Sequence, residues 1–314
     1  MSRIFITGAT GFVGANLVQR LLNKKQEVHI ALRPESNLWR LTPILKKIKS
    51  CELNLFDYSA VQKALKKIKP EIIYHLAAYG TYPFERDDQS IVKTNIVASF
   101  NIFRAAQEIP GLKIIVNVGS SSEYGFNDKP MKESDFPEPN TLYGATKLSQ
   151  TFLARYFSKC GRVPIITLRL FAVYGPYEKP GRLMPDILIN WVKKTPLKLS
   201  SPVPRRDFIY IEDALDVFEI VSKRSDLGGE VLNLGTGKDF SVGEVVKIAS
   251  ALFNARPEII WGAKERRNFD RRGSWRADPA KIKKILKWQP RYSLPQGLKK
   301  SFSWFKQNLH LYES

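Results

Sequence analysis

The chain has 314 residues, 43% hydrophobic and 25% charged, and 50 Lys and Arg against 30 Asp and Glu give a formal net charge of +20. This composition is typical of a globular protein and excludes a disordered tail, and no apolar run approaches the roughly 18 residues of a membrane span. Two cysteines, three histidines and the lack of a CxxC pair exclude a disulfide framework and argue against a metal site. We therefore expect a cytoplasmic protein without a metal.

The excess of positive charge leaves nucleic acid, a membrane surface and small polyanions open as partners. Residues 264–291 carry eleven Lys and Arg against three Asp and Glu, whereas the lysines of 45–69 are spaced as on a solvated helix surface. A nucleic-acid binder needs exposed aromatic side chains among its basic residues. We interpret the aromatic residues of the basic stretch as the core of a small lobe, and expect neither nucleic acid nor membrane as a partner.

Short apolar strands alternate with amphipathic helices through the first half of the chain. This alternation predicts βαβ units with a parallel sheet covered on both faces, that is, a Rossmann-type, doubly wound α/β fold. Strands are expected at 4–6, 28–32, 50–55, 72–77, 113–118 and 164–170, and helices at 12–24, 59–68, 88–108 and 143–159.

After about residue 175 prolines cluster and helices outnumber strands. We expect a first domain over 1–174 and a smaller, mostly helical lobe over 175–314, with a strand near 231–234 that returns to the main sheet. The helices of this lobe are expected at 183–194, 213–223, 242–253, 278–287 and 295–309.

A glycine turn follows the first strand. Gly8, Gly11 and Gly14 form a GxxGxxG pattern between that strand and the first helix. Glycines permit a tight turn and let the backbone approach a pyrophosphate, while the helix N-terminus supplies free N–H groups. The pattern predicts a dinucleotide site.

The end of the second strand bears on the choice of dinucleotide. An NAD-specific fold places Asp or Glu there for the ribose hydroxyls, but here Leu32 and Arg33 stand at this point. Because an arginine pairs well with a 2′-phosphate, NADP(H) is favoured. NAD(H) remains possible if Arg33 is a solvated loop residue. Asn54 is either a hydrogen-bond partner of the adenine or a turn residue.

Tyr143 and Lys147 lie one helical turn apart on one face of a predicted helix. A lysine ammonium lowers the pKa of a neighbouring tyrosine and so makes it an acid–base group near neutrality. Ser120 follows the fifth predicted strand, where its hydroxyl can polarise a reacting carbonyl, and Ser121 is the alternative in the serine run.

Together these patterns resemble the extended short-chain dehydrogenase/reductases of the nucleotide-sugar epimerase, dehydratase and reductase group. The resemblance covers nearly the whole chain. It rests on the segments 8–14, 75–78, 119–125, 143–147, 168–176, 205–213, 233–237 and 277–279.

The resemblance implies a catalytic triad of Ser120, Tyr143 and Lys147, and a nucleoside-diphosphate sugar held by the second lobe. The implied substrate contacts are Ser121, Arg206 and Arg266, although Arg206 has an alternative role as an ion-pair partner of Asp213. A homodimer through the helices near 88–108 and 143–159 is also implied. The predicted cofactor contacts are Gly8, Thr10, Gly11, Phe12, Val13, Gly14, Arg33, Asn54, Leu55, Leu76, Ala77, Ala78, Tyr143 and Lys147.

Two departures from the family pattern bear on which reaction the chain catalyses. Dehydratases of the group carry Asp-Glu directly after the triad Thr, whereas Ser121 and Ser122 stand here and Glu123 comes one residue later. Ala172 replaces an asparagine that contacts the substrate in many members. The first departure argues against a 4,6-dehydratase, and the second puts a UDP-galactose 4-epimerase in doubt.

With NADPH favoured, the main hypothesis is an NADPH-dependent reductase of a nucleoside-diphosphate 4-keto-(6-deoxy)-hexose, in which Tyr143 donates the proton. The alternative is a nucleotide-sugar 4-epimerase with bound NAD. A non-catalytic NADP-binding sensor is disfavoured because both Tyr143 and Lys147 are present.

Overall fold

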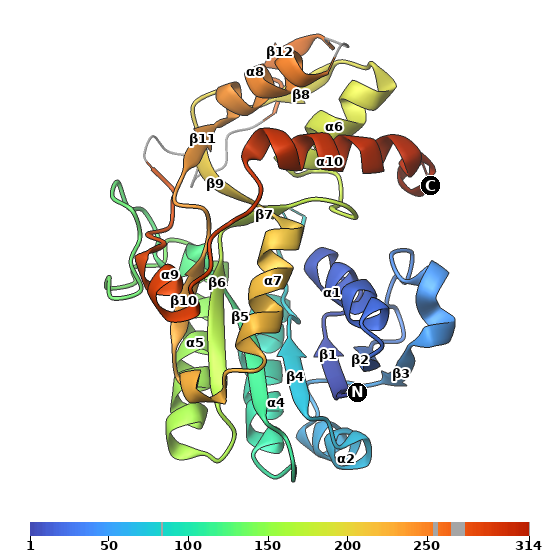
Figure 1. Cartoon of the computed structure of the whole chain (residues 1–314), viewed down its shortest axis with the longest axis vertical. Coiled ribbons are helices and arrows are strands. Elements are labelled where there is room, and N and C mark those ends of the chain that lie inside the picture. Colours follow the sequence, from blue (N-terminus) through green and yellow to red (C-terminus); the bar gives the residue numbers. More distant parts are fainter. Residues whose placement is uncertain (83, 254–256, 265–273, 314) are drawn as a thin grey trace. The chain divides into compact units, whose positions relative to one another are not determined.

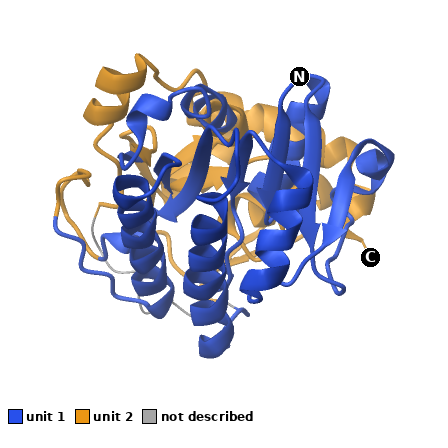
Figure 2. Ribbon diagram, turned by 90° about the horizontal axis from the view of Figure 1, so that it is seen from below, with its two compact units in different colours: residues 1–125, 136–170, 215–232 blue, residues 126–135, 171–214, 233–314 orange. Residues whose placement is uncertain are grey.

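The computed structural model describes residues 1–82, 84–253, 257–264 and 274–313, and the chain divides into two compact units (Figure 2). Unit 1 comprises residues 1–125, 136–170 and 215–232, and unit 2 comprises 126–135, 171–214 and 233–314. Within the described ranges, no helix has the length and apolar character needed to cross a membrane.

A seven-stranded sheet with the order β10-β6-β5-β4-β1-β2-β3 runs through unit 1 (Figure 1). Neighbouring strands from β6 to β3 pair in parallel, so their carboxyl ends share one edge. The predicted α/β fold with one large parallel sheet is confirmed, and β10 lies beside β6. The strands are β1 (Arg3–Thr7), β2 (Glu27–Leu32), β3 (Lys49–Glu52), β4 (Ile72–His75), β5 (Ile114–Ser120), β6 (Ile165–Leu170) and β10 (Val231–Leu234).

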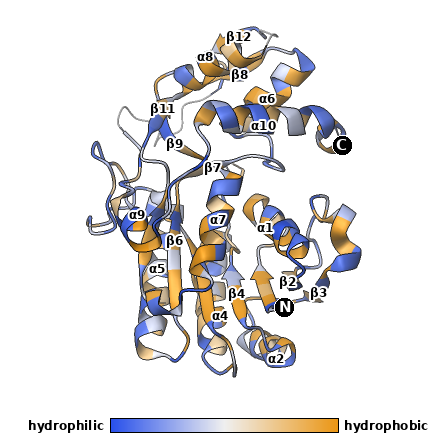
Figure 3. Ribbon diagram, in the orientation of Figure 1, coloured by the Kyte–Doolittle hydropathy of each residue, from blue (hydrophilic) through white to orange (hydrophobic). Residues whose placement is uncertain are grey.

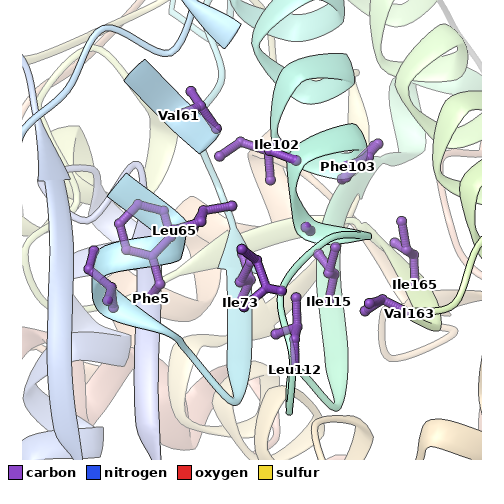
Figure 4. Packing of buried hydrophobic residues seen from close by; sticks show 14 of the residues in the cluster. Phe5, Val61, Leu65, Ile73, Ile102, Phe103, Leu112, Ile115, Val163 and Ile165 are labelled. Carbon is purple, nitrogen blue, oxygen red and sulfur yellow. The ribbon is translucent and has the colours of Figure 1, made fainter. Parts of the chain in front are cut away.

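Helices cover both faces of this sheet. On one face, α2, α4 and α5 pack on Phe5, Ile73 and Ile115 in an apolar cluster (Figure 4). On the other face, Phe218 of α7 stacks on Tyr74, and Arg20 of α1 pairs with Asp216 and Glu219 of α7. The helices are α1 (Phe12–Asn23), α2 (Tyr58–Ile68), α3 (Asp88–Val92), α4 (Ala98–Ala106), α5 (Leu142–Cys160) and α7 (Ile211–Val221), with a π-helical turn at Lys93–Val97 and 3-10 turns at Thr42–Lys47, Ser121–Glu123 and Ser225–Leu227.

Unit 2 contains a three-stranded sheet, β11-β9-β7, and a strand pair, β12-β8. Asp207 of β9 is buried and accepts hydrogen bonds from the backbone of Thr236, Gly237 and Ala277, which ties these segments together. The elements are β7 (Ala172–Tyr174), β8 (Leu197–Leu199), β9 (Arg205–Tyr210), β11 (Asp239–Ser241), β12 (Ile259–Trp261), α6 (Leu183–Lys193), α8 (Val242–Leu252), α9 (Ala280–Leu286), α10 (Leu294–Gln307) and a 3-10 turn at Leu309–Tyr312.

The helices of unit 2 start and end within three residues of their predicted limits, but its short strands were not predicted. Four of them have only three residues, which is too short for an alternating apolar pattern to register. Hydrophobic (orange) and hydrophilic (blue) residues alternate along the helices in Figure 3, as expected of helices with one buried face.

Candidate active site

The glycine turn lies between β1 and α1 and approaches the neighbouring strand closely. Gly8 has φ +70°, and a Cβ atom there would lie 2.6 Å from the backbone of Leu76 and Ala77. A Cβ atom on Gly14 would lie 2.2 Å from the carbonyl oxygen of Gly8. Gly11 caps α1 without a side-chain hydrogen bond. The turn therefore leaves a bare helix N-terminus, which suits the pyrophosphate of a dinucleotide.

The other predicted cofactor contacts surround this turn or follow the next strands. Thr10 lies in the turn, Phe12 and Val13 begin α1, and Leu76, Ala77 and Ala78 come directly after β4. The Ala77 N–H donates to the Thr7 hydroxyl at 3.3 Å.

Asn54 and Leu55 follow β3, the strand at the edge of the sheet. The side-chain oxygen of Asn54 accepts a hydrogen bond from the Phe56 N–H at 3.0 Å, the contact of a turn residue. The Leu55 carbonyl accepts from Asn101 of α4 at 2.9 Å.

Two arginines lie in the segment after β2, and they differ in burial. Arg33 has a side chain 59% exposed, and its guanidinium pairs with Glu35 at 3.2 Å. Arg40 is only 8% exposed, donates to the Thr10 carbonyl of the glycine turn at 3.0 Å and lies over the Trp39 ring. Sequence reasoning missed Arg40, because nothing in the pattern signals that a loop arginine folds back onto the turn.

Ser120 is the last residue of β5 and caps the 3-10 turn that follows. Its hydroxyl oxygen accepts from the Ser122 N–H at 3.1 Å, and its own N–H donates to the Glu123 carboxylate at 2.8 Å. Ser121 is also buried. The serine run is therefore fixed at the carboxyl edge of the sheet.

The first turn of α5 packs against this serine turn. A Cβ atom on Gly144 would lie 2.4 Å from the Ser122 carbonyl oxygen, so only glycine allows this approach. The Thr141 side chain caps the helix by accepting from the Gly144 N–H at 3.0 Å. The start of α5, which carries Tyr143, therefore lies against the serine turn that follows β5.

Lys147 is completely buried within the same helix. Its ammonium donates to the Val118 carbonyl of β5 and to the side-chain oxygen of Gln150. Gln150 in turn donates to Asn117 at 2.6 Å. Burial lowers the pKa of Lys147 to about 8, against the opposing effect of Glu123. A cation at this depth favours the phenolate form of a tyrosine nearby.

His75, in the segment that carries the family resemblance, is buried and neutral. Its ring nitrogens contact the Thr7 hydroxyl at 2.7 Å and the Ser99 hydroxyl at 2.8 Å. Burial, together with the positive charge of Lys147, lowers the pKa of His75 to about 3. The ring therefore joins β1, β4 and α4 and does not titrate near neutrality.

Asn95 is a second residue that sequence reasoning missed. It lies buried in the π-helical turn, donates to the Tyr79 carbonyl and to the Thr146 hydroxyl, each at 2.9 Å, and accepts from the Tyr79 N–H at 3.0 Å. The Thr146 hydroxyl donates to the Tyr143 carbonyl at 3.0 Å. Asn95 therefore fixes the segment after β4 against the helix that carries Tyr143.

The predicted substrate contacts divide between the units. Arg206 belongs to β9 of unit 2, where its guanidinium lies 5.1 Å from the Trp275 ring centroid and donates to the Arg205 carbonyl at 2.7 Å. The Asp213 carboxylate accepts from the backbone N–H groups of Arg291 and Tyr292. Arg266 lies outside the described residues.

A family model described as the NAD dependent epimerase/dehydratase family matches residues 4–235. The chain belongs to this family. The predicted resemblance to extended short-chain dehydrogenase/reductases is thereby confirmed, as is the prediction of an enzyme.

Relatives within this family match the chain over its full length. A UDP-glucuronate 4-epimerase of Thermodesulfobacterium geofontis is 27% identical, over 100% of this chain and 99% of that protein. A dTDP-glucose 4,6-dehydratase of Neisseria meningitidis is 26% identical, over 98% of this chain and 94% of that protein. The crystal structure of a UDP-glucuronic acid 4-epimerase from Bacillus cereus, in complex with UDP-glucuronic acid and NAD, is 25% identical over 97% and 99% of the two chains, with a TM-score of 0.84.

Proposed function

We propose that this chain is a UDP-sugar 4-epimerase that retains NAD while it oxidises C4 of the sugar and reduces it again. The observation that carries the proposal is the packing of α5, with Tyr143 and the buried Lys147, on β5 and on the serine turn that Ser120 begins at the carboxyl edge of the sheet. The full-length similarity to UDP-glucuronate 4-epimerases supports this reaction over the reductase that the sequence favoured.

In the proposed reaction the Tyr143 phenolate removes the proton of the C4 hydroxyl, and Ser120 donates a hydrogen bond to the same oxygen. Lys147 would keep the phenolate stable and would hold the nicotinamide ribose. NAD, when bound, would supply a reversible acceptor for the hydride of C4, which is the chemistry that an inversion at C4 needs. Tyr143 then gives the proton back, so the residues end in their starting state.

The environment of Arg33 gives no support to NADP(H). Its guanidinium is solvent-exposed and already paired with Glu35, whose carboxylate would repel a 2′-phosphate beside it. The related Bacillus cereus enzyme was solved with NAD. We therefore propose NAD, with its pyrophosphate on the glycine turn and with Arg40 holding that turn in place.

A dehydratase is disfavoured by the surroundings of Glu123. Elimination of water needs an acid and a base beside the sugar, and Ser121 and Ser122 provide no carboxyl group. Glu123 is completely buried and bonded to Ser120, Thr151 and Arg169. Its carboxylate is therefore committed to contacts inside unit 1.

A homodimer is part of the proposal. Phe152 and Tyr156 on α5 have exposed fractions of 53% and 60%, and Val97 lies exposed next to α4. Pairing of these two helices with those of a second copy would bury the exposed side chains. Sedimentation of the purified protein tests this, since a monomer at micromolar concentration would contradict it.

The function is tested by incubating the purified protein with UDP-glucuronic acid and, separately, with UDP-glucose, without added cofactor. We expect the C4 epimer of at least one of them to form. The contrary result is no epimer from either sugar, with consumption of NADPH on a nucleotide 4-keto-6-deoxy sugar instead, which would restore the reductase hypothesis.

A further inference from the structure

Glu123 is a carboxylate that the proposed reaction does not use, yet it lies completely buried directly behind Ser120. Burying a charge without partners is costly, so its contacts indicate what the residue does. Its side chain is 0% exposed and that of its partner Arg169 is 5% exposed, with 2.7 Å between the two groups.

The carboxylate of Glu123 accepts hydrogen bonds from three different elements. One oxygen accepts from the Ser120 N–H at the end of β5, at 2.8 Å. The other accepts from the Thr151 hydroxyl of α5 at 2.9 Å and from the Arg169 guanidinium of β6 at 2.7 Å. The carboxylate therefore links the strand end that carries Ser120 to the helix that carries Tyr143.

Gly119 makes room for this arrangement. A Cβ atom at that position would lie 2.6 Å from the carboxylate oxygen of Glu123 that holds Ser120. The Arg169 guanidinium is fixed on its other side by the ring of Tyr124, 4.5 Å from the ring centroid. The link is thus built from residues of β5, β6 and α5 that fit around one carboxylate.

We propose that Glu123 is a positioning residue of the enzyme, which sets Ser120 relative to the Tyr143–Lys147 helix through its buried carboxylate. This inference rests on the proposed function, since it assigns Ser120, Tyr143 and Lys147 to the reaction.

The charge of Glu123 also acts on Lys147. Burial lowers the pKa of this lysine, and the negative charge of Glu123 opposes that effect. The other groups that face Lys147 are the Val118 carbonyl of β5, Gln150 of its own helix, and His75 of β4, which stays neutral with a pKa of about 3. Loss of the carboxylate therefore lowers the pH at which the ammonium loses its proton.

The substitution Glu123→Gln tests the inference. Glutamine keeps the size of the side chain but offers one acceptor and one donor end, so at least one of the three donors around it loses its acceptor. We expect kcat for epimerisation to fall about 10- to 100-fold while KM changes less than about 3-fold. The alkaline limb of the kcat profile should move down by about half a pH unit to one unit.

The chain offers a matched control in unit 2. Glu244 forms the same capping box with Ser241 and pairs with Arg205 at 3.0 Å, but it is exposed. Glu244→Gln removes the same kind of charge from the same local motif, and we expect kcat and its pH profile to stay as in the unsubstituted protein.

Glu123→Gln leaves Arg169 buried without its partner, so NAD binding and the thermal unfolding midpoint are measured alongside. If the single variant does not fold, the double variant Glu123→Gln with Arg169→Met takes its place, since it leaves no unpaired buried charge. Its kcat and the alkaline limb of its pH profile are then compared with those of the unsubstituted protein. A folded variant with the original kcat and pH profile overturns the inference. So does a loss of kcat with an unmoved alkaline limb that Glu244→Gln reproduces.

Failure of the proposed function is separable from failure of this inference. If the unsubstituted protein forms no C4 epimer but reduces a keto sugar, the proposed function fails. The comparison of Glu123→Gln with Glu244→Gln is then made on that reduction, because Ser120, Tyr143 and Lys147 would serve either reaction.

Discussion

Two regions along the carboxyl edge of the large sheet hold their charged side chains differently. At the end of β5, Lys147 and Glu123 are buried, and their charged groups reach across to neighbouring elements: Lys147 to the Val118 carbonyl of β5, and Glu123 to Thr151 of α5 and Arg169 of β6. At the end of β2, Arg33 is exposed and its partner is Glu35, two residues along the chain. Only the first region has side-chain positions that the fold itself determines.

The difference shows when a sequence motif is a reliable guide to function. The helix that carries Tyr143 and Lys147 has a fixed position, since it packs at Gly144 on the serine turn that follows β5. An exposed arginine can turn to a phosphate, to a carboxylate or to water at little cost in free energy. The residue type at the end of β2 therefore does not decide the cofactor, whereas the buried region supports a specific chemical role.

The largest effect on kcat is expected from a substitution in the buried region at the end of β5. Tyr143→Phe removes the acid–base group and should lower kcat about a thousandfold, within the range of ~10²–10⁴ for general acid–base catalysis. Tyr156→Phe, on the exposed side of the same helix, is the matched control and should change kcat less than about twofold. Steady-state kinetics of both variants check this, and a Tyr143→Phe enzyme with near-normal kcat would remove Tyr143 from the mechanism.

His75, at the end of the neighbouring strand β4, should make the stability of the protein depend on pH in acid. The pKa of His75 is about 3 in the folded chain, below its ordinary value of 6.5, so the unfolded chain binds the proton more readily. Stability is then fully present above pH 6.5 and is lost as the pH falls toward 3, with a loss from this group of about 2 kcal/mol between pH 7 and pH 5. Urea unfolding at both pH values should show a smaller decrease for His75→Gln, and an equal decrease would contradict this assignment.

The two arginines after β2 provide a direct test of the comparison. Arg40→Met removes a buried contact to the glycine turn and should weaken NAD binding about tenfold. Arg33→Met removes only an exposed ion pair, and the dissociation constant for NAD should change less than about twofold. Calorimetric titration of the two variants with NAD and with NADP decides this. A larger effect of Arg33→Met, confined to NADP, would reverse the assignment.

The smallest expected effect is a pH dependence of the unsubstituted enzyme. The pKa of Lys147 is lowered to about 8 by burial, so the ammonium that supports the Tyr143 phenolate is half lost at that pH. We expect kcat to fall by half near pH 8 and to continue downward above it. A profile that stays flat to pH 10 would show that the charge of Lys147 does not limit the reaction.

Much of this site could be predicted from the sequence, because its parts are local. The glycine turn, the spacing of Tyr143 and Lys147, and Ser120 at a strand end each lie within one element or at its boundary. Arg40, Asn95 and Glu123 could not be predicted, since their roles depend on contacts with residues distant in sequence. Asn95 meets Thr146, 51 positions away, and Glu123 meets Arg169, 46 positions away.

The fold, like the site, could be predicted where its elements are recognisable locally and not where they depend on distant residues. The strands of the large sheet were all predicted, most of them from apolar runs, whereas the three-residue strands of unit 2 depend on pairing partners such as β8 with β12, about 60 positions apart. The preference for NADP finds no support in the structure for a similar reason, because the ion pair of Arg33 with Glu35 is a side-chain arrangement that residue types alone do not determine.

The most direct test of the epimerase proposal follows the hydride itself. UDP-glucuronic acid or UDP-glucose carrying deuterium at C4 is incubated with the purified protein, and the product is examined by NMR and mass spectrometry. The proposal predicts a C4 epimer that keeps its deuterium at C4, with no net change in reduced cofactor. Deuterium lost from C4, or no epimer without added NADPH, would contradict it.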